Sequence, residues 1–196
     1  MGIHDVLVTG SPPNTPPPAS GSGKFASATE LVSFVKERMG DAMRVAVCGY
    51  PRGSRGERGE YAADLAEVGR QVLAGAERVV CLPCFDAETH WSFVADARAA
   101  RISCPIAPGL LPIYSAAEFR HVCRALAVDP PAWLEAKLRA AAGTKEVAAL
   151  GESLLVQQLE ALNSSRACTP HIYTLNSEAI LQPLALAGYK PLKHRA

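Results

Sequence analysis

The sequence predicts an α/β fold in which parallel strands alternate with helices along the chain. Three observations predict it: short β-branched, apolar runs recur five times, most lead into a segment with helical spacing of apolar residues, and polar, Gly and Pro residues gather directly after the strands. Crossover helices between apolar strands produce a parallel sheet, so a doubly wound sheet and a β/α barrel both fit this pattern. In either architecture, ligands bind at the carboxyl ends of the strands.

The first strand and helix flank a long loop. The run DVLVTG at 5–10 predicts a strand, and the Pro/Gly/Ser-rich stretch at 11–24 predicts a flexible loop without packing residues. A helix is expected over 27–39, because Ser27 and Glu30 stand in the order of a capping box. The next strand, polar turn and helix are expected at 44–50, 49–59 and 60–76.

The rest of the chain continues the alternation. Further strands are expected at 78–85, 104–113 and 171–176, and further helices at 86–100, 115–126, 131–142, 145–162 and 177–188. Two consecutive helices thus separate the helix at 115–126 from the last strand. We expect residues 1–196 to form a single domain, since the length is enough for one domain with a hydrophobic core.

Composition and charge exclude several classes of function. The net charge is only +1 and there is no long basic run, so nucleic acid is not expected as a partner. No apolar stretch approaches the roughly 20 residues of a membrane span, and the first residues lack the pattern of a signal peptide. We therefore expect a cytoplasmic location, with a mitochondrial one as the alternative.

The Cys-x-x-Cys at Cys81 and Cys84 raises the question of a redox or metal site. A redox pair of the thioredoxin type opens a helix, whose dipole lowers the thiol pKa, whereas this pair falls in a predicted strand. Zinc needs four ligands, usually from two such pairs, and the other cysteines supply no second pair. We expect both cysteines to be packing residues and predict no metal site.

Five stretches of the sequence share their order and character with one enzyme family. They are DLAEVGRQVLAGA at 64–76, CFD at 84–86, PIAPGLLPI at 105–113, PPAWLEAKL at 130–138 and HIYTLN at 171–176. Through them the chain resembles the later part of methylenetetrahydrofolate reductase, a flavin-dependent enzyme built on an eight-stranded β/α barrel. That family passes hydride from NAD(P)H through FAD to methylenetetrahydrofolate, and the methyltetrahydrofolate produced feeds methionine synthesis.

The resemblance implies a partial β/α barrel of the TIM type, with five parallel strands equivalent to barrel strands 4–8 and with flanking helices. It implies FAD as cofactor, NAD(P)H as reductant and a folate as substrate, and it identifies no catalytic residue in this chain. The residues that it assigns to FAD are Thr9, Gly10, Ser11, Phe25, Ala26, Tyr50, Asp64 and Arg70. The residues that it assigns to the folate are Glu118 and Tyr173.

The chain departs from the family at several positions. Ser11 stands where the family has an acid near the flavin, Ser54 replaces a histidine, and Ser177 replaces an arginine. Leu82 and Glu118 each stand where the family has a glutamine. The family's catalytic glutamate belongs to a part of the barrel that precedes the residues present here. We therefore expect a truncated or degenerate enzyme whose activity alone is negligible; the alternative is a non-catalytic relative that serves as a structural or scaffold subunit.

The two end strands of a partial barrel have consequences for assembly. Strands at 5–10 and 171–175 would expose unpaired N–H and C=O groups, and neither carries a lysine or an internal proline that would discourage pairing. We therefore expect a homo-oligomer, or a partner chain that completes the barrel.

Overall fold

The computed structural model describes residues 2–10, 25–53, 58–163, 169–175, 184, 185 and 188. The predicted loop at 11–24 and most of the predicted helix at 177–188 lie outside the described residues. The strands are β1 (Asp5–Val8), β2 (Arg44–Gly49), β3 (Arg78–Pro83), β4 (Ile106–Leu110) and β5 (His171–Ile172). The helices are α1 (Ala28–Met39), the 3₁₀ turn η1 (Gly40–Ala42), α2 (Arg58–Leu73), α3 (Ala87–Ala99), α4 (Ala116–Ala125), α5 (Ala132–Ala140) and α6 (Thr144–Asn163).

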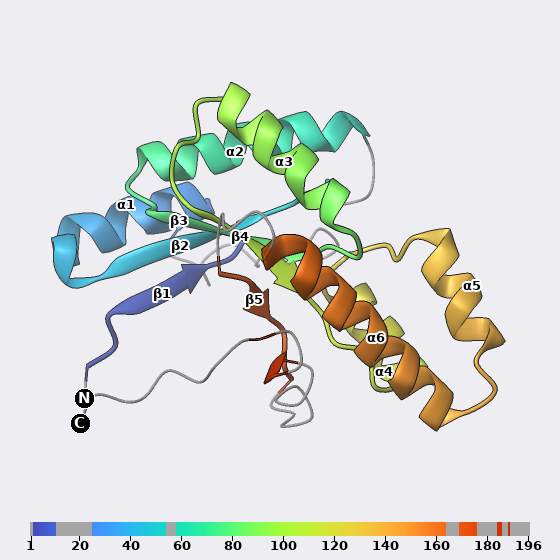
Figure 1. Cartoon of the computed structure of the whole chain (residues 1–196). Coiled ribbons are helices and arrows are strands. Elements are labelled where there is room, and N and C mark those ends of the chain that lie inside the picture. The colour runs from blue at the N-terminus through green and yellow to red at the C-terminus, as the bar shows by residue number, and fades with distance from the viewer. Residues whose placement is uncertain are drawn as a thin grey trace.

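The five strands are parallel and form one sheet in the order β1-β2-β3-β4-β5, so each strand pairs with its neighbour in the sequence. Figure 1 shows α1, α2 and α3 over one face of β1–β3, while α4, α5 and α6 gather beside β4 and β5. The sheet is therefore half of a β/α barrel with flanking helices, and β1 and β5 are its two ends. This arrangement confirms the predicted fold class.

Alternate residues of the strands face the helices and form a core cluster. Val47 of β2 and Val79 of β3 pack there with Phe93 of α3, as the two-residue period of a strand requires. The intervening residues point to the inner face of the half-barrel. There Leu7 of β1 is 39% exposed, whereas Val80 of β3 is only 6% exposed. The inner face is thus better covered at the centre of the sheet than at its β1 end.

All five strands are shorter than the sequence predicts, and β3 and β5 illustrate the difference. β3 ends at Pro83, where its pairing with β4 is irregular: proline has no N–H, and the N–H of Cys84 donates to the carbonyl of Gly109 at 3.0 Å. β5 comprises only His171 and Ile172. Beyond it, the Tyr173 N–H still donates to the carbonyl of Leu110, at 2.9 Å. The strand pairing therefore stops where the ligand-binding edge of a parallel sheet begins.

The helices of the described residues agree with the predictions to within two residues at each end, except that α2 ends at Leu73 rather than at residue 76. α2 begins at Arg58, so the prediction of a turn as far as residue 59 is wrong, and the first turn of this helix reaches further toward the end of β2. Ser27 caps α1 as predicted, because its hydroxyl accepts the N–H of Glu30 at 3.1 Å. None of the helices in the described residues combines the length and the apolar character that crossing a lipid bilayer requires.

Two glycines allow close packing near the carboxyl ends of the strands. A Cβ on Gly109 of β4 would lie 2.0 Å from the carbonyl oxygen of Cys81 in β3. A Cβ on Gly151 of α6 would lie 1.9 Å from the carbonyl oxygen of Ile113. No side chain fits at these separations, so glycine is required at both positions. The two contacts hold β3, β4 and α6 around the segment 111–114 that follows β4.

Candidate functional site

A cavity of about 260 Å³, here called the β4–β5 cavity, opens at the carboxyl ends of β4 and β5. The two residues that the resemblance assigns to the folate, Glu118 and Tyr173, both line it. The complete lining is Leu111, Pro112, Tyr114, Ser115, Glu118, Phe119, Val122, Tyr173, Thr174 and Leu175. Residues more than fifty positions apart in the chain therefore meet at the edge where ligands of parallel sheets bind.

Glu118 reaches this cavity because of how α4 begins. The Ser115 hydroxyl accepts the N–H of Glu118, at 3.4 Å, and so caps the helix. The next residue, Phe119, is buried and meets Phe85 edge-to-face, with ring centroids 5.5 Å apart. This packing fixes the rotation of the helix and leaves Glu118 exposed. Among the described residues its carboxylate has no hydrogen-bond or ion-pair partner, so it is available to a ligand.

Tyr173 presents its ring rather than its hydroxyl. The hydroxyl donates to the carbonyl oxygen of Cys81 at 3.2 Å, and the ring meets His171 edge-to-face, with centroids 4.9 Å apart. Burial raises the pKa of Tyr173, so the hydroxyl stays protonated and keeps this bond. The ring is thereby held in place as an apolar surface on which a flat ligand can pack.

A second cavity, of about 240 Å³ and here called the β2–β3 cavity, lies at the carboxyl ends of β2 and β3. Tyr50 and Leu82 line it together with the loop at 128–132. Burial, followed by nearby negative groups that include Asp64, raises the pKa of Tyr50 to about 12. Asp64 therefore lies close enough to Tyr50 for their charges to interact. Leu82 offers no hydrogen-bonding group where the resemblance expects a glutamine.

The predicted FAD residues near α1 are only partly available to a ligand. Thr9 and Gly10 are exposed after β1, and a Cβ on Gly10 would lie 3.8 Å from the Tyr50 hydroxyl, which is ordinary contact distance. Phe25 packs on Phe34, with centroids 5.0 Å apart. The Ala26 N–H is already bonded to the carboxylate of Glu30, at 2.5 Å. Ser11 lies outside the described residues.

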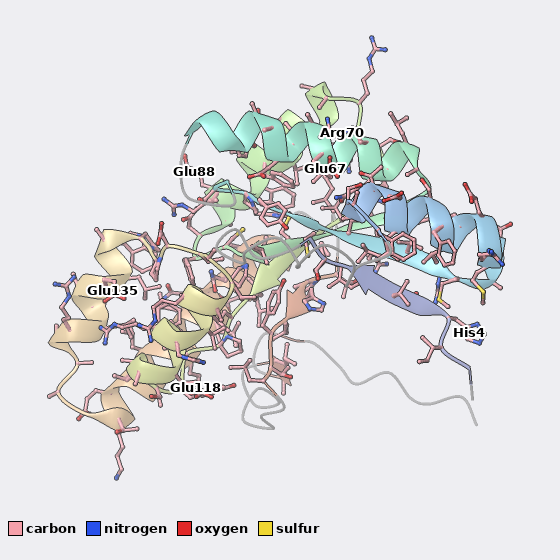
Figure 2. All side chains as sticks on the ribbon, turned by 180° about the vertical axis from the view of Figure 1, so that it is seen from behind. His4, Glu67, Arg70, Glu88, Glu118 and Glu135 are labelled. Atoms are coloured by element: carbon pink, nitrogen blue, oxygen red, sulfur yellow. The ribbon has the colours of Figure 1, made fainter. Side chains whose placement is uncertain are left out.

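Arg70, another predicted FAD residue, is held in an ion pair on α2. Its Nε and Nη2 donate to Glu67 Oε2 at 2.8 and 2.5 Å, while its side chain remains 59% exposed. Thr29 of α1 and Gln71 of α2 donate to the other oxygen of Glu67, at 2.6 and 3.2 Å. Burial raises the pKa of Glu67, but these hydrogen bonds outweigh it, so the pKa is lower than usual. Figure 2 shows this group on α2, well apart from Glu118 on α4.

The Cys-x-x-Cys lies in the core. Cys81 is fully buried in β3, and Cys84, directly after the strand, is 2% exposed. Burial raises the pKa of Cys84 to about 12, so its thiol is not reactive at neutral pH. Within the described residues no three His, Cys, Asp or Glu side chains come together in a metal-binding arrangement.

A larger groove of about 1010 Å³, the outer groove, lies where α2, α3 and α5 approach one another. Two of its three carboxylates, Asp86 and Asp96 but not Glu88, are already engaged within the described part of the protein. Asp86 caps α3 by accepting the N–H of Thr89 at 2.7 Å, and Asp96 accepts the hydroxyl of Tyr61 at 2.7 Å. Volume alone therefore does not make this groove the better candidate site.

Sequence reasoning missed Tyr114, whose hydroxyl is buried at the β4–β5 cavity and has no hydrogen-bond partner among the residues that the structure describes. The only sequence signal was an aromatic residue directly before Ser115, which begins a helix at the end of a strand. Such a position predicts nearness to the ligand-binding edge, but it does not reveal an unpaired hydroxyl.

Comparison with known proteins agrees with the family resemblance of the sequence motifs. The sequence profile of the family described as methylenetetrahydrofolate reductase matches residues 1–185. A rice protein, probable methylenetetrahydrofolate reductase (NADH) of Oryza sativa subsp. japonica, is 31% identical over 188 residues, which cover 90% of this chain and 32% of the relative. The 5,10-methylenetetrahydrofolate reductase of Escherichia coli (strain K12) is 29% identical over 161 residues, which cover 82% of this chain and 53% of the relative. The chain thus spans about a third of the plant protein and about half of the bacterial one.

A solved structure supports the same fold. It is described as an uncharacterized protein from Clostridium thermocellum that binds two copies of 5-methyl-5,6,7,8-tetrahydrofolic acid. It matches with a TM-score of 0.55 at 16% identity, over 87% of this chain and 64% of that one. The likeness in fold agrees with the sequence profile, which extends over most of the chain. The chain belongs to the methylenetetrahydrofolate reductase family.

Proposed function

We propose that this chain binds a reduced folate in the β4–β5 cavity. The observation that carries the proposal is that Glu118 and Tyr173, the two residues assigned to the folate by resemblance, line one cavity at the carboxyl edge of the sheet. The folate ligand described for the Clostridium thermocellum protein, which shares the fold, adds support.

The chemistry of the cavity suits a pterin. A carboxylate accepts two parallel N–H bonds from a flat, bidentate donor, and the amino-pyrimidinone edge of a pterin is such a donor. Glu118 supplies a carboxylate without a partner among the described residues. Tyr173 supplies an aromatic ring fixed by its bond to Cys81, against which the flat part of the ligand packs.

The family reaction would also require FAD and NAD(P)H, and the residues described here fit FAD only in part. The exposed backbone at Gly10 beside Tyr50 leaves room for a ligand. Against this, the guanidinium of Arg70 is neutralised by Glu67, and the N–H of Ala26 is bonded to Glu30. A phosphate group would have to displace these internal partners.

One observation favours the second candidate function, a non-catalytic relative that serves as a structural or scaffold subunit. Leu82 lines the β2–β3 cavity, where the resemblance expects a glutamine, and an alkyl side chain cannot hold or orient a polar substrate. Folate binding without turnover is compatible with this role. Function depends on the residues of the site rather than on the fold, so the two activities must be measured separately.

Calorimetric titration of the full chain with 5-methyltetrahydrofolate tests the proposal. We expect saturable binding that Glu118→Gln weakens about tenfold, the loss expected when a charged hydrogen-bond acceptor is replaced by a neutral one. Glu88→Gln is the matched control, because Glu88 is also an exposed glutamate in the first turn of a capped helix but lies outside the cavity. Absence of binding, or equal losses in the two variants, would overturn the proposal. The presence or absence of a flavin absorbance band in the purified protein reports independently whether it retains flavin.

A further inference from the structure

The Tyr114 hydroxyl is one of few buried polar groups left without a hydrogen-bond partner in the described part of the chain. The others are the two ring nitrogens of His90. Tyr114 differs from His90 in its position, because it lines the β4–β5 cavity together with Glu118 and Tyr173. Buried hydroxyls are normally paired, so an unpaired one at a candidate binding site requires an explanation.

The position of Tyr114 is imposed by its neighbours. Ile113 on one side is buried, and Ser115 on the other side caps α4. α6 presses on this segment, because Gly151 brings the helix backbone into contact with the carbonyl of Ile113. The backbone of Tyr114 is therefore fixed from both directions, and the side chain is held at the cavity by the packing of α6 and α4.

The hydroxyl is suited to donate a hydrogen bond. Burial, and then the negative charge of Glu152 on α6, raises the pKa of Tyr114, so the proton is retained. Among the described residues the hydroxyl has no acceptor within hydrogen-bonding distance. The missing partner is thus an acceptor, such as a carbonyl or carboxylate oxygen.

The cavity lining also includes an exposed residue with a strained backbone. Leu175 lines the cavity just beyond β5, is 51% exposed and has a φ of 51°. Residues with a side chain rarely adopt this left-handed conformation, which stores strain. Water does not reach the Tyr114 hydroxyl in the free chain, so an acceptor reaches it only when the cavity wall shifts.

We propose that Tyr114 is a positioning residue of the folate cavity, whose hydroxyl donates to an acceptor oxygen of the bound reduced folate and has no partner until the ligand arrives. This inference rests on the proposed folate binding. It follows from the physical asymmetry of hydrogen bonds: an unpaired buried group destabilises the free protein, and a ligand that pairs it recovers that free energy as affinity. The free protein thus keeps the Tyr114 hydroxyl as an unpaired hydrogen-bond donor that the ligand can use.

Tyr114→Phe provides the test, because it removes only the hydroxyl. We expect the midpoint of thermal unfolding of the free protein to stay the same or to rise, since the lost group had no partner. We expect the affinity for 5-methyltetrahydrofolate to fall about tenfold, which corresponds to one hydrogen bond. If Tyr114 had a purely structural role, the unfolding midpoint and the folate affinity would fall together.

Tyr61→Phe is the matched control. The Tyr61 hydroxyl donates to Asp96 at 2.7 Å and lies outside the β4–β5 cavity, so this variant should lower the unfolding midpoint and leave the affinity unchanged. If Glu118→Gln weakens binding but Tyr114→Phe does not, the inference about Tyr114 fails while the proposed function stands. A fall in the unfolding midpoint of Tyr114→Phe also overturns the inference, because the hydroxyl would then have an internal partner. If the unmodified chain does not bind the folate, both proposals fail together.

Discussion

The β4–β5 cavity and the segment around α1 and α2 both carry residues that the family resemblance assigns to ligands. The two regions differ in whether the polar groups of those residues already have partners within the protein. In the cavity, the Glu118 carboxylate and the Tyr114 hydroxyl have no partner within the described residues. Around α1 and α2, the Ala26 N–H is bonded to Glu30 and Arg70 is paired with Glu67. A polar group that already has an internal partner must lose that bond before it binds a ligand. The comparison therefore favours the cavity over the segment around α1 and α2 as the proposed binding region.

The largest effect is expected at the contact that shapes the cavity. Gly151→Ala would place a Cβ 1.9 Å from the carbonyl of Ile113, so α6 must move away, and we expect a loss of about 3 kcal/mol or more in the free energy of unfolding. Chemical denaturation measures it. Gly69→Ala in α2 is the control, because no atom lies within 4 Å of its added Cβ, and it should stabilise by up to about 1 kcal/mol. Equal effects would show that α6 does not constrain the cavity.

The next largest effect is expected at His90. Like the Tyr114 hydroxyl, its ring nitrogens are buried and have no partner among the described residues, but they do not line the β4–β5 cavity. His90 is 1% exposed, and burial lowers its pKa to about 4. The unfolded chain therefore takes up a proton near pH 6.5, while the folded chain resists it until about pH 4, so stability falls as the pH drops through this window. We expect a loss of about 2–3 kcal/mol between these limits, measured by denaturation at each pH. His90→Leu should remove most of the loss above pH 5, whereas His121→Gln, at an exposed position, should keep it.

A smaller effect tests the region around α1 and α2. Glu67→Gln removes a carboxylate that binds Thr29, Gln71 and Arg70, and we expect a loss of about 1 kcal/mol in the free energy of unfolding at pH 7. Because the pKa of Glu67 is lowered in the folded state, this contribution is present above the unfolded pKa and disappears as the pH falls through the folded one. Glu88→Gln should change little. A flavin absorbance band that appears only in Glu67→Gln would show that Arg70 can serve a cofactor once it is released.

The smallest effect asks whether the two cavities act separately. Leu82 lines the β2–β3 cavity and is half-buried, so Leu82→Gln should change the free energy of unfolding by only about 0.5 kcal/mol. Its affinity for 5-methyltetrahydrofolate should equal that of the unmodified chain. A change of more than about threefold, roughly 0.7 kcal/mol, would mean that the ligand spans both cavities and that binding is not confined to the β4–β5 cavity.

The fold could be predicted from the sequence because strand–helix alternation is a local pattern repeated along the chain. Strand ends were harder to predict. Apolar character continues past Pro83 to Phe85, whereas the regular pairing with β4 shifts between Val80 and Pro83, where proline offers no N–H. The short β5 had no such signal, because the apolar pattern of 171–176 does not show how few of its residues would find a partner in β4.

The motifs identify candidate site residues but do not show which of them already have internal partners, and the binding roles of these residues stay predictions. Glu118 and Tyr173 were found through the motifs around them, and the structure brings both to one cavity. The pair formed by Glu67 and Arg70 could have been predicted, since residues three apart on a helix are neighbours. The unpaired hydroxyl of Tyr114 could not have been predicted, because it depends on the absence of an acceptor in α6, which lies far along the chain. The assembly of this chain with another copy or a partner stays a prediction, which light scattering can test.

The order of the sheet also bears on how the chain acquires its structure. Because the spatial order β1-β2-β3-β4-β5 is the order of synthesis, each new strand meets the edge left by the one before it. Most strand contacts form between neighbouring segments of the chain, so each one closes only a short loop and has a small entropic cost. Folding can therefore proceed one β/α unit at a time. The Tyr173 hydroxyl bond to Cys81 is an exception, since it reaches past β4 to β3. The cavity is therefore completed last, after the barrel segment that supports it has formed.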